Sequence, residues 1–370
     1  MRVLMASDLF HPYLLGGGER RMYEIARRLA RRHEVHVLTR RFRGLPSYEL
    51  HEGVHIHRVF VPSGRIKLES PTDGLVFTAG TLLKGMRPDD FDVYAPQQFF
   101  PIPPLWLSAC AREKIIVPTI HDVYRETWTQ KYGLKGVLMS LFEKIILRLP
   151  YSKVITVSNS TKRKLMRELP EEKIEVIPNG VDLKLYEGPA KKASRPRIVY
   201  VGRLVGYKHV DDLLLAFSKL PAESQLFVVG DGPEMGRLRS LSEKLGLGKR
   251  VVFTGFVKEE EKISILKSSH VLVLPSSTEG FGIVVLEAWA SGTIPVVSNI
   301  PALTELVQDG ESGMVFRLHD VSQLTQKLKQ VLEEDSLREE LVKEGEKRVR
   351  NFDWEIIAKK HEEIFKSLLG

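Results

Sequence analysis

The sequence predicts an α/β protein made of two Rossmann-like, doubly wound domains. Apolar, β-branched runs alternate with helical segments along the first half of the chain, and the same alternation restarts in the second half. Such alternation is typical of a parallel sheet covered by helices. A stretch rich in Lys, Ala, Gly and Pro, residues 183–196, separates the halves. The 370 residues are also enough for two domains.

We therefore expect a first domain over 1–182, a linker over 183–196, a second domain over 197–350 and a C-terminal helix over 351–370. In the first domain we predict a helix over 19–33 and strands at 2–8, 34–40, 54–61, 91–96, 114–122 and 153–158. In the second domain we predict a helix over 210–220 and strands at 197–202, 225–231, 251–256, 270–275 and 294–298. Ligands of such sheets bind beyond the carboxyl ends of the strands. The site is therefore expected in a cleft between two facing domains, built from residues that directly follow strands.

The passage "STEGFGIVVLEAWASG", residues 277–292, places two carboxylates around a glycine turn. It follows an apolar strand and runs into a helix, so Glu279 lies on the loop and Glu287 lies inside the helix. Gly280 and Gly282 leave backbone N–H groups uncovered at the helix start, which favours an anion. Carboxylates beside that anion would accept hydrogen bonds from hydroxyl groups. A phosphate next to hydroxyl-rich groups indicates a nucleotide sugar.

Two cations follow the first strand of the second domain. Arg203 and Lys208 lie in the loop "RLVGYKH" and can hold a diphosphate, Arg as a fork and Lys as a point charge. Ordinary surface charge is the alternative. The glycine turn after Glu279 favours the diphosphate, because both loops leave strands of one sheet.

Two further candidates follow strands of the first domain. Gly16 and Gly17 belong to "GGGER", where glycines allow the backbone to approach a ligand closely, although a flexible loop without a chemical role is the alternative. His121 belongs to "TIHD" and could donate a hydrogen bond to a sugar hydroxyl, although a packed histidine is the alternative.

Other patterns argue against competing chemistries. "VVGDGPEMG" lacks the dinucleotide spacing, and the next strand has no ribose-binding acid, which disfavours a nicotinamide oxidoreductase. "DFD", residues 90–92, looks like a loop before a strand and not a metal motif. No histidine spacing indicates a metal site. The apolar helix over 135–151 is interpreted as a core or cleft-lining helix, with membrane contact as the alternative.

The net charge of +8 lies entirely in the first half. Residues 1–182 hold 28 Lys and Arg against 20 Asp and Glu, while the remainder holds 27 of each. Arg27, Arg28, Arg31 and Arg32 are spaced to form a basic stripe on one helix. An anionic acceptor or an anionic membrane surface fits this excess, as does a merely solvated face. No motif for reading nucleic acid is present, so we expect no such partner.

Composition also bounds the compartment. No apolar run reaches the length of a membrane span, and the first strand begins at once without a signal-peptide pattern. Cys110 is the only cysteine, which excludes intrachain disulfides and indicates a reducing environment. We expect a cytoplasmic protein that associates peripherally with the inner face of a membrane.

Taken together, these motifs resemble those of the family 4 retaining glycosyltransferases. The resemblance rests on "GGGER", "TIHD", "VSNSTK", "VIPNGVD", "YVGRLVGYKH", "VGDGPE", "FTGFV" and "STEGFGIVVLEAWASGTIPVV", which occur in the family's order over nearly the whole chain. The closing "FDWEIIA" is similar to the family's final helix, which returns to the first domain. The resemblance implies the GT-B fold and a reaction that needs no metal or other cofactor.

The resemblance also implies roles for particular residues. His121, Glu279, Arg203 and Lys208 are expected to act in catalysis. Glu279 would bind hydroxyls of the transferred sugar, and Glu287 those of the ribose. The donor site is expected to comprise Gly16, Gly17, Arg203, Lys208, Phe256, Val257, Glu279, Gly280, Phe281, Gly282, Ile283 and Glu287.

The expected function is retaining transfer of a hexose from a nucleotide diphosphate sugar. We expect a UDP-sugar first and GDP-mannose second, with a sugar, lipid-linked or other anionic acceptor. The alternatives are an inactive sugar- or lipid-binding module of the same fold and a nucleotide-sugar 2-epimerase.

Overall fold

The structure is a computed structural model that describes residues 1–14, 16–60, 71–83, 91–125, 128 and 133–370. Its chain divides into two compact units. The first comprises Met1–Asn179 together with Trp354–Gly370, and the second comprises Gly180–Asp353. Val61, the end of a predicted strand, and Asp90 of the "DFD" motif lie outside the described residues.

The main sheet of the first unit has the order β3-β4-β2-β1-β5-β6 and is parallel except for the pair β3 and β4. Its strands are β1 (Arg2–Ala6), β2 (Glu34–Arg41), β3 (Tyr48–His51), β4 (Val54–Phe60), β5 (Val93–Pro96) and β6 (Ile115–Ile116). The sequence interpretation did not include β3. It forms a two-residue hairpin through Glu52 and Gly53, which both have positive φ, at 47° and 79°, as a tight hairpin turn requires.

A second, three-stranded sheet completes the first unit. It pairs β7 (Thr119–Ile120), β8 (Val154–Thr156) and β9 (Ile174–Val176) in parallel. The single strand predicted over 114–122 is therefore wrong, because it is divided between two sheets at Pro118. Proline has no N–H for a ladder, and the Pro118 carbonyl accepts from the Ile155 amide instead.

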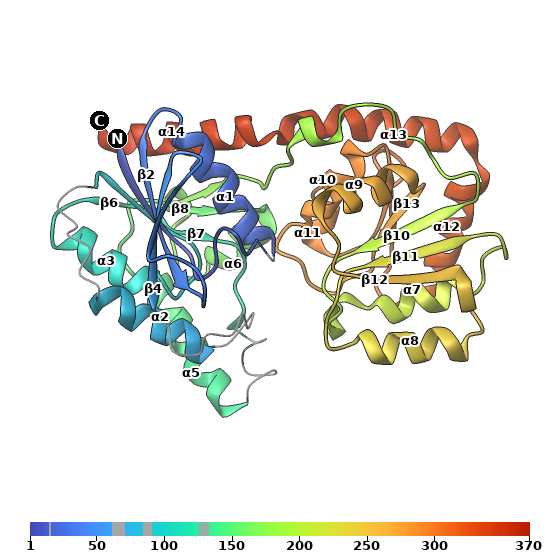
Figure 1. Ribbon diagram of the computed structural model, residues 1–370, viewed down its shortest axis with the longest axis horizontal. Coiled ribbons are helices and arrows are strands. Elements are labelled where there is room, and N and C mark those ends of the chain that lie inside the picture. Colours follow the sequence, from blue (N-terminus) through green and yellow to red (C-terminus); the bar gives the residue numbers. More distant parts are fainter. Residues whose placement is uncertain (15, 61–70, 84–90, 126–127, 129–132) are drawn as a thin grey trace. The chain divides into compact units, whose positions relative to one another are not determined.

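Helices cover both faces of the first unit. They are α1 (Gly17–Leu29), α2 (Pro71–Leu83), α3 (Ile102–Cys110), α5 (Leu134–Leu147), α6 (Asn159–Leu165) and α14 (Trp354–Leu369). Figure 1 shows α14, the last helix of the chain, running beside α1, the first. It buries Trp354, Ile357 and Phe365 against the sheet face that also holds Val3 and Val35. This helix therefore belongs to the same compact unit as residues 1–179.

The second unit is one parallel sheet of order β12-β11-β10-β13-β14-β15. Its strands are β10 (Arg197–Val201), β11 (Gln225–Val229), β12 (Val251–Gly255), β13 (Val271–Leu274), β14 (Ile294–Ser298) and β15 (Met314–Phe316). Its helices are α7 (Val210–Phe217), α8 (Met235–Lys244), α9 (Glu259–Ser268), α10 (Ile283–Ala290), α11 (Pro301–Thr304), α12 (Val321–Glu333) and α13 (Asp335–Val349). β11 and β12 lie on one side of β10, whereas β13, β14 and β15 lie on its other side. β10 and β13 are therefore neighbours, and the loops that follow them emerge side by side.

The structure places residues 183–196, the expected linker, inside the second unit. Tyr186 is buried, and Lys192 donates hydrogen bonds to the Ser269 carbonyl at 2.7 Å and to the Thr293 hydroxyl at 3.2 Å. Burial lowers the pKa of Lys192 to about 8. A polar, Pro-containing composition therefore does not mark a free segment here, because the half-buried Lys192 is held by residues that precede β13 and β14.

Candidate active site

An ion pair joins the two loops that follow the neighbouring strands β10 and β13. Lys208 Nζ lies 2.5 Å from Glu279 Oε1, and each side chain is only 13% exposed. The Ser276 hydroxyl donates to the same carboxylate oxygen at 2.7 Å. The sequence motifs that contain Lys208 and Glu279, 71 residues apart, thus meet in one site.

The loop between Glu279 and α10 carries the glycine turn. Gly282 has a φ of 98°, which side chains rarely adopt, and an added Cβ would lie 2.8 Å from a Leu303 methyl group. Phe281 is buried, and α10 begins directly after the glycine, at Ile283. The Val285 amide donates to the Gly282 carbonyl at 2.9 Å. A helix start leaves its earlier amides without intrahelical acceptors, and this favours an anion next to Glu279.

Arg203 also lies in the loop after β10, where two tyrosines contact it. Its guanidinium donates to the Tyr207 hydroxyl at 2.9 Å, while its carbonyl accepts from the Tyr200 hydroxyl at 2.9 Å. The Tyr207 carbonyl in turn accepts from the Ser277 amide at 2.9 Å. Tyr207 thereby connects Arg203 to the loop that carries Glu279, and sequence reasoning missed it.

The glycines of "GDGP" hold the Arg203 loop from the other side. A Cβ on Gly230 would lie 2.0 Å from the Gly202 carbonyl oxygen, and one on Gly232 would lie 2.3 Å from that of Leu204. Only glycine permits this approach. These residues therefore position the loop after β10, which accounts for the motif without a dinucleotide.

Glu287 is buried on α10 and forms an ion pair with Lys262 of α9, with 2.7 Å between Nζ and Oε1. Lys262 also lies 3.1 Å from Glu259. The sequence interpretation did not include Lys262. Phe256 and Val257 follow β12, and the Phe256 side chain is 67% exposed. The structure thus presents Phe256 as an accessible apolar surface at the edge expected to meet the base.

In the first unit, the glycine loop and His121 lie together. A Cβ on Gly18 would lie 3.3 Å from His121 Nε2, and the same nitrogen is 3.0 Å from Gln97 Oε1. Gly16 precedes α1, and Gly17 is its first residue. Burial and the Arg21 guanidinium lower the pKa of His121 to about 3. The ring is therefore neutral near pH 7, with one nitrogen as donor and the other as acceptor.

Arg21 forms the most buried polar network of the first unit. It donates to the carbonyls of Ile177 at 2.8 Å and Pro178 at 2.7 Å and to Asn179 Oδ1 at 2.9 Å. Its guanidinium also lies 3.1 Å from His361 Nε2 of α14. Burial lowers the pKa of Arg21 to about 9. Asn179 of the "NGVD" motif thus helps to hold α1 against residues 177–179.

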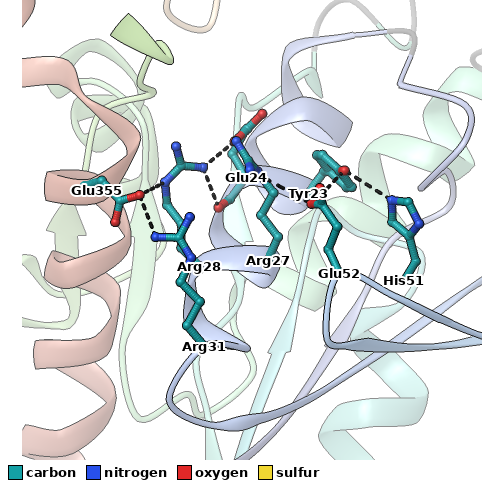
Figure 2. Close-up of polar contacts among 8 residues, drawn as sticks. All are labelled: Tyr23, Glu24, Arg27, Arg28, Arg31, His51, Glu52 and Glu355. Atoms are coloured by element: carbon teal, nitrogen blue, oxygen red, sulfur yellow. Dashed lines mark hydrogen bonds and ion pairs between the residues drawn. The ribbon is translucent and has the colours of Figure 1, made fainter. Parts of the chain in front are cut away.

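The predicted basic stripe on α1 is largely neutralised by carboxylates. Figure 2 shows Arg28 and Arg31 directed at Glu355 of α14, at 3.1 and 2.9 Å, and Arg27 directed at Glu24, at 2.7 Å. Arg32 lies 3.0 Å from Glu362. The stripe therefore joins α1 to α14 instead of offering four unpaired cations to a surface.

Comparisons with known proteins match both halves of the chain. A model described as Glycosyltransferase Family 4 matches residues 15–185, and one described as Glycosyl transferases group 1 matches residues 184–348. Phosphatidyl-myo-inositol mannosyltransferase of Mycobacterium leprae is 32% identical and is aligned over 75% of this chain and 74% of its own. An uncharacterized glycosyltransferase of Methanocaldococcus jannaschii is 28% identical over 99% of this chain and 98% of its own.

Solved structures share the fold along the whole chain. Sucrose-phosphate synthase from Thermosynechococcus elongatus has a TM-score of 0.84 at 22% identity, covering 100% of this chain and 99% of its own. HepE of Anabaena, in complex with UDP and glucose, has a TM-score of 0.79 at 18% identity, covering 99% and 100%.

The two Rossmann-like units define a GT-B glycosyltransferase. The chain belongs to glycosyltransferase family 4, whose enzymes retain the configuration of the transferred sugar. It is therefore an enzyme that transfers a sugar from a nucleotide-sugar donor. This confirms the resemblance inferred from the motifs.

Proposed function

We propose that the enzyme transfers a hexose, without a metal ion, from a UDP-sugar to a lipid-linked or other anionic acceptor. The observation that carries this proposal is the meeting of Lys208 and Glu279 at the glycine turn before α10. It combines a cation for phosphate, a carboxylate for sugar hydroxyls and the N-terminus of a helix in one place. Arg203, held by Tyr207, adds a second cation to the same loop.

Catalysis would consist mainly of positioning and of stabilising the diphosphate that leaves. Arg203 and Lys208 supply the positive charge that offsets the growing charge on that group. Lys208 is already paired with Glu279, so a donor diphosphate would compete for it. Glu279 would then be released toward the hydroxyls of the transferred sugar, which couples phosphate binding to sugar binding.

Neutral His121 would serve as a hydrogen-bonding partner of a sugar hydroxyl. Its low pKa excludes a resident positive charge near pH 7, so it is no ready proton donor. An imidazole of such low pKa is also a weak base, so a donor phosphate oxygen would take the acceptor's proton instead. Glu287 would bind the ribose while Lys262 stays paired with its carboxylate.

An apolar stripe on α5 supports a lipid-borne acceptor. Leu134, Leu138, Leu141 and Ile145 recur at helical spacing and are exposed, Leu134 by 84%. Lys135 and Lys144 flank them and are exposed as well. An apolar face edged by lysines suits the boundary of an anionic membrane. The mannosyltransferase relative, named for phosphatidyl-myo-inositol, supports the same class of acceptor.

Over the residues that the structure covers, no helix is both long and apolar enough to cross a membrane. We propose peripheral attachment at the cytoplasmic face, with α5 as the contact. This replaces the α1 stripe, whose arginines are paired.

Thermal-shift measurements with UDP-, GDP- and ADP-sugars test the donor, because a bound ligand raises the melting temperature by mass action. The expected result is a rise with UDP and UDP-sugars that is lost in a Lys208→Ala variant. A rise with GDP-mannose alone would replace the donor with our second choice, which the mannosyltransferase relative favours. Binding without transfer to any acceptor would favour the inactive module, and conversion of the free donor to its 2-epimer would favour the epimerase.

A further inference from the structure

Two histidines of the second unit occupy backbone positions that favour glycine. His209 follows the turn Gly206–Lys208 and precedes α7, and its φ is 46°. His319 lies between β15 and α12, and its φ is 65°. Side chains adopt this left-handed region at a steric cost that glycine avoids. A requirement for the turns alone would therefore favour glycine at both positions, which raises the question of what the imidazoles contribute.

The two imidazoles contact each other edge to face, beside a carboxylate. Their ring centroids are 4.3 Å apart with planes at 88°, and His319 Nδ1 lies 3.0 Å from Asp212 Oδ2. One donor atom from each of the three residues lies within 4.8 Å of the others. The neighbouring Asp211 is paired with Arg237 at 3.1 Å, whereas Asp212 is paired with His319.

We propose that His209, Asp212 and His319 form a binding site for one divalent transition-metal ion such as Zn²⁺, separate from the donor site. Two imidazoles and one carboxylate are a common ligand set for such ions, and a water would complete the tetrahedron. Metal–ligand bonds of about 2.1 Å put neighbouring ligand atoms about 3.4 Å apart. The 3.0 Å between Nδ1 and Oδ2 is close to that spacing. The His319 side chain is 55% exposed, so a small rotation of its ring can bring the ligand atoms of all three residues to that spacing.

The simplest alternative is an ion pair that joins the two loops. Asp212 and His319 would suffice for it, and it gives no reason for a second histidine at a left-handed position. Perpendicular ring planes, in contrast, allow nitrogen lone pairs from the two rings to converge on one point. The histidines are 110 positions apart in the sequence, which is why no motif indicated this site.

A second cluster, His11, Glu49 and His51 of the first unit, suits a metal less well and provides an internal comparison. Its rings are stacked, with centroids 3.8 Å apart and planes at 15°, so their lone pairs run parallel. Glu49 is engaged by buried Arg58 at 2.7 Å. A metal would have to displace that guanidinium from its partner.

The test uses the full chain without a histidine tag, stripped of metal with a chelator that is then removed. Co²⁺ titration followed by its visible absorption measures binding, and Zn²⁺ measures competition. His209→Gly and His319→Gly each remove a ligand while supplying the residue that the backbone favours. In chelator both variants should melt at or above the wild-type temperature. Each should bind Co²⁺ at least about tenfold more weakly, since loss of even an outer partner of a metal ligand has that effect.

His51→Asn in the other cluster is the matched control and should leave tight Co²⁺ binding in place. Wild-type protein without saturable Co²⁺ absorption, or loss of binding in His51→Asn but not in the glycine variants, would overturn the proposal. An unchanged affinity in folded His209→Gly and His319→Gly would overturn it equally.

Discussion

Lys208 and Arg203 lie on one loop, which follows β10. Lys208 is paired with a carboxylate, and Arg203 donates to a phenol. Replacing either by alanine removes a charge-assisted hydrogen bond to the diphosphate, worth roughly 1.5–3 kcal/mol. We expect each variant to lose about ten- to a hundredfold in kcat/KM, measured as donor consumption. Near-normal turnover in the folded double variant would disprove the assignment.

Glu279 and Glu287 should separate in a binding experiment. Glu279→Ala frees Lys208, so free UDP should bind at least as tightly as to wild type while turnover is mostly lost, because the lost contact is with the transferred sugar. Glu287→Gln should weaken the binding of UDP and the binding of the donor alike, by about 2 kcal/mol. Calorimetry with free UDP, beside rates, decides between them.

Because Glu287 is buried against Lys262, its variant needs a control for stability. Lys262→Met removes the ion-pair partner of Glu287 and leaves the carboxylate that binds the ribose. It should therefore weaken UDP binding less than Glu287→Gln does. Equal losses of UDP in Glu279→Ala and Glu287→Gln would mean that the passage is one undivided site.

Glu143 gives the first unit a pH-dependent stability. It is buried on α5 and accepts from the Tyr124 amide at 2.8 Å and from Trp128 Nε1 at 2.6 Å, and burial raises its pKa to about 7. The folded protein therefore binds the proton more tightly than the unfolded chain, and stability falls as pH rises from about 4.5 to about 7.

In Glu143→Gln that contribution is absent. We expect the difference in unfolding free energy, wild type minus variant, to fall by about 3 kcal/mol between pH 4 and pH 8. Urea titrations at several pH values measure it. The substitution also changes the hydrogen bond from Trp128, but this loss of unfolding free energy is the same at every pH and cancels in the comparison. A difference in unfolding free energy that stays constant across that range would contradict the assignment.

At the residue scale, the sequence predicted the charged groups better than their partners. The motifs of Lys208 and Glu279 were expected in one site because both follow strands, and the structure brings them together. Lys262 was not expected, since its approach to Glu287 depends on how α9 packs on α10. The same reason hid Tyr207, whose hydroxyl reaches Arg203 only through the shape of the turn after β10.

At the element scale, the exposed face of α5 makes a prediction about membranes. Leu138→Gln with Leu141→Gln removes two exposed apolar side chains and no buried contact of the core. Binding to vesicles that contain anionic lipid should fall at least about tenfold, since burying a leucine is worth about 1.5–3 kcal/mol. Vesicle flotation measures it, and binding by wild type should weaken with salt.

The control for the α5 double variant must replace an exposed leucine, which excludes the buried Leu105. Leu215→Gln on α7 replaces a leucine of the second unit that is 36% exposed, and it should leave flotation unchanged. Equal vesicle binding by wild type and the α5 double variant would exclude α5 as the contact.

Strand order could be predicted in outline, but short strands could not. The regular parallel strands of both units carry long apolar runs that are visible in the sequence. The apolar run over 114–122 conceals a break, because Pro118 ends one pairing and the chain moves to another sheet. β3 has only four residues, exposes the apolar Leu50 and half-buries the polar Glu49 and His51, and it owes its place to the turn at Glu52 and Gly53.

At the scale of the whole molecule, the first unit depends on the end of the chain. Deleting residues 354–370 uncovers the apolar face that Trp354, Ile357 and Phe365 close, and it removes His361 from buried Arg21. Three such side chains are worth about 1.5–3 kcal/mol each. We expect the first unit to lose its cooperative unfolding, while the second keeps its own transition in calorimetry.

Limited proteolysis would localise the effect, with new cleavage expected within 1–179 and not within 180–353. Phe365→Ala in the full chain provides a milder version that should lower the melting temperature of the first unit only. A deletion variant whose two units melt as before would contradict this dependence.

The position of α14 also sets an order of events on the ribosome. Residues 180–353 are all translated before Trp354–Leu369, so the second unit has every strand and helix while the first still lacks one. Domains generally fold as units during synthesis, with the N-terminal one first. Here the domain that is begun first is finished last, and a nascent chain stopped at Asp353 would carry a complete second unit beside a first unit with an open apolar face.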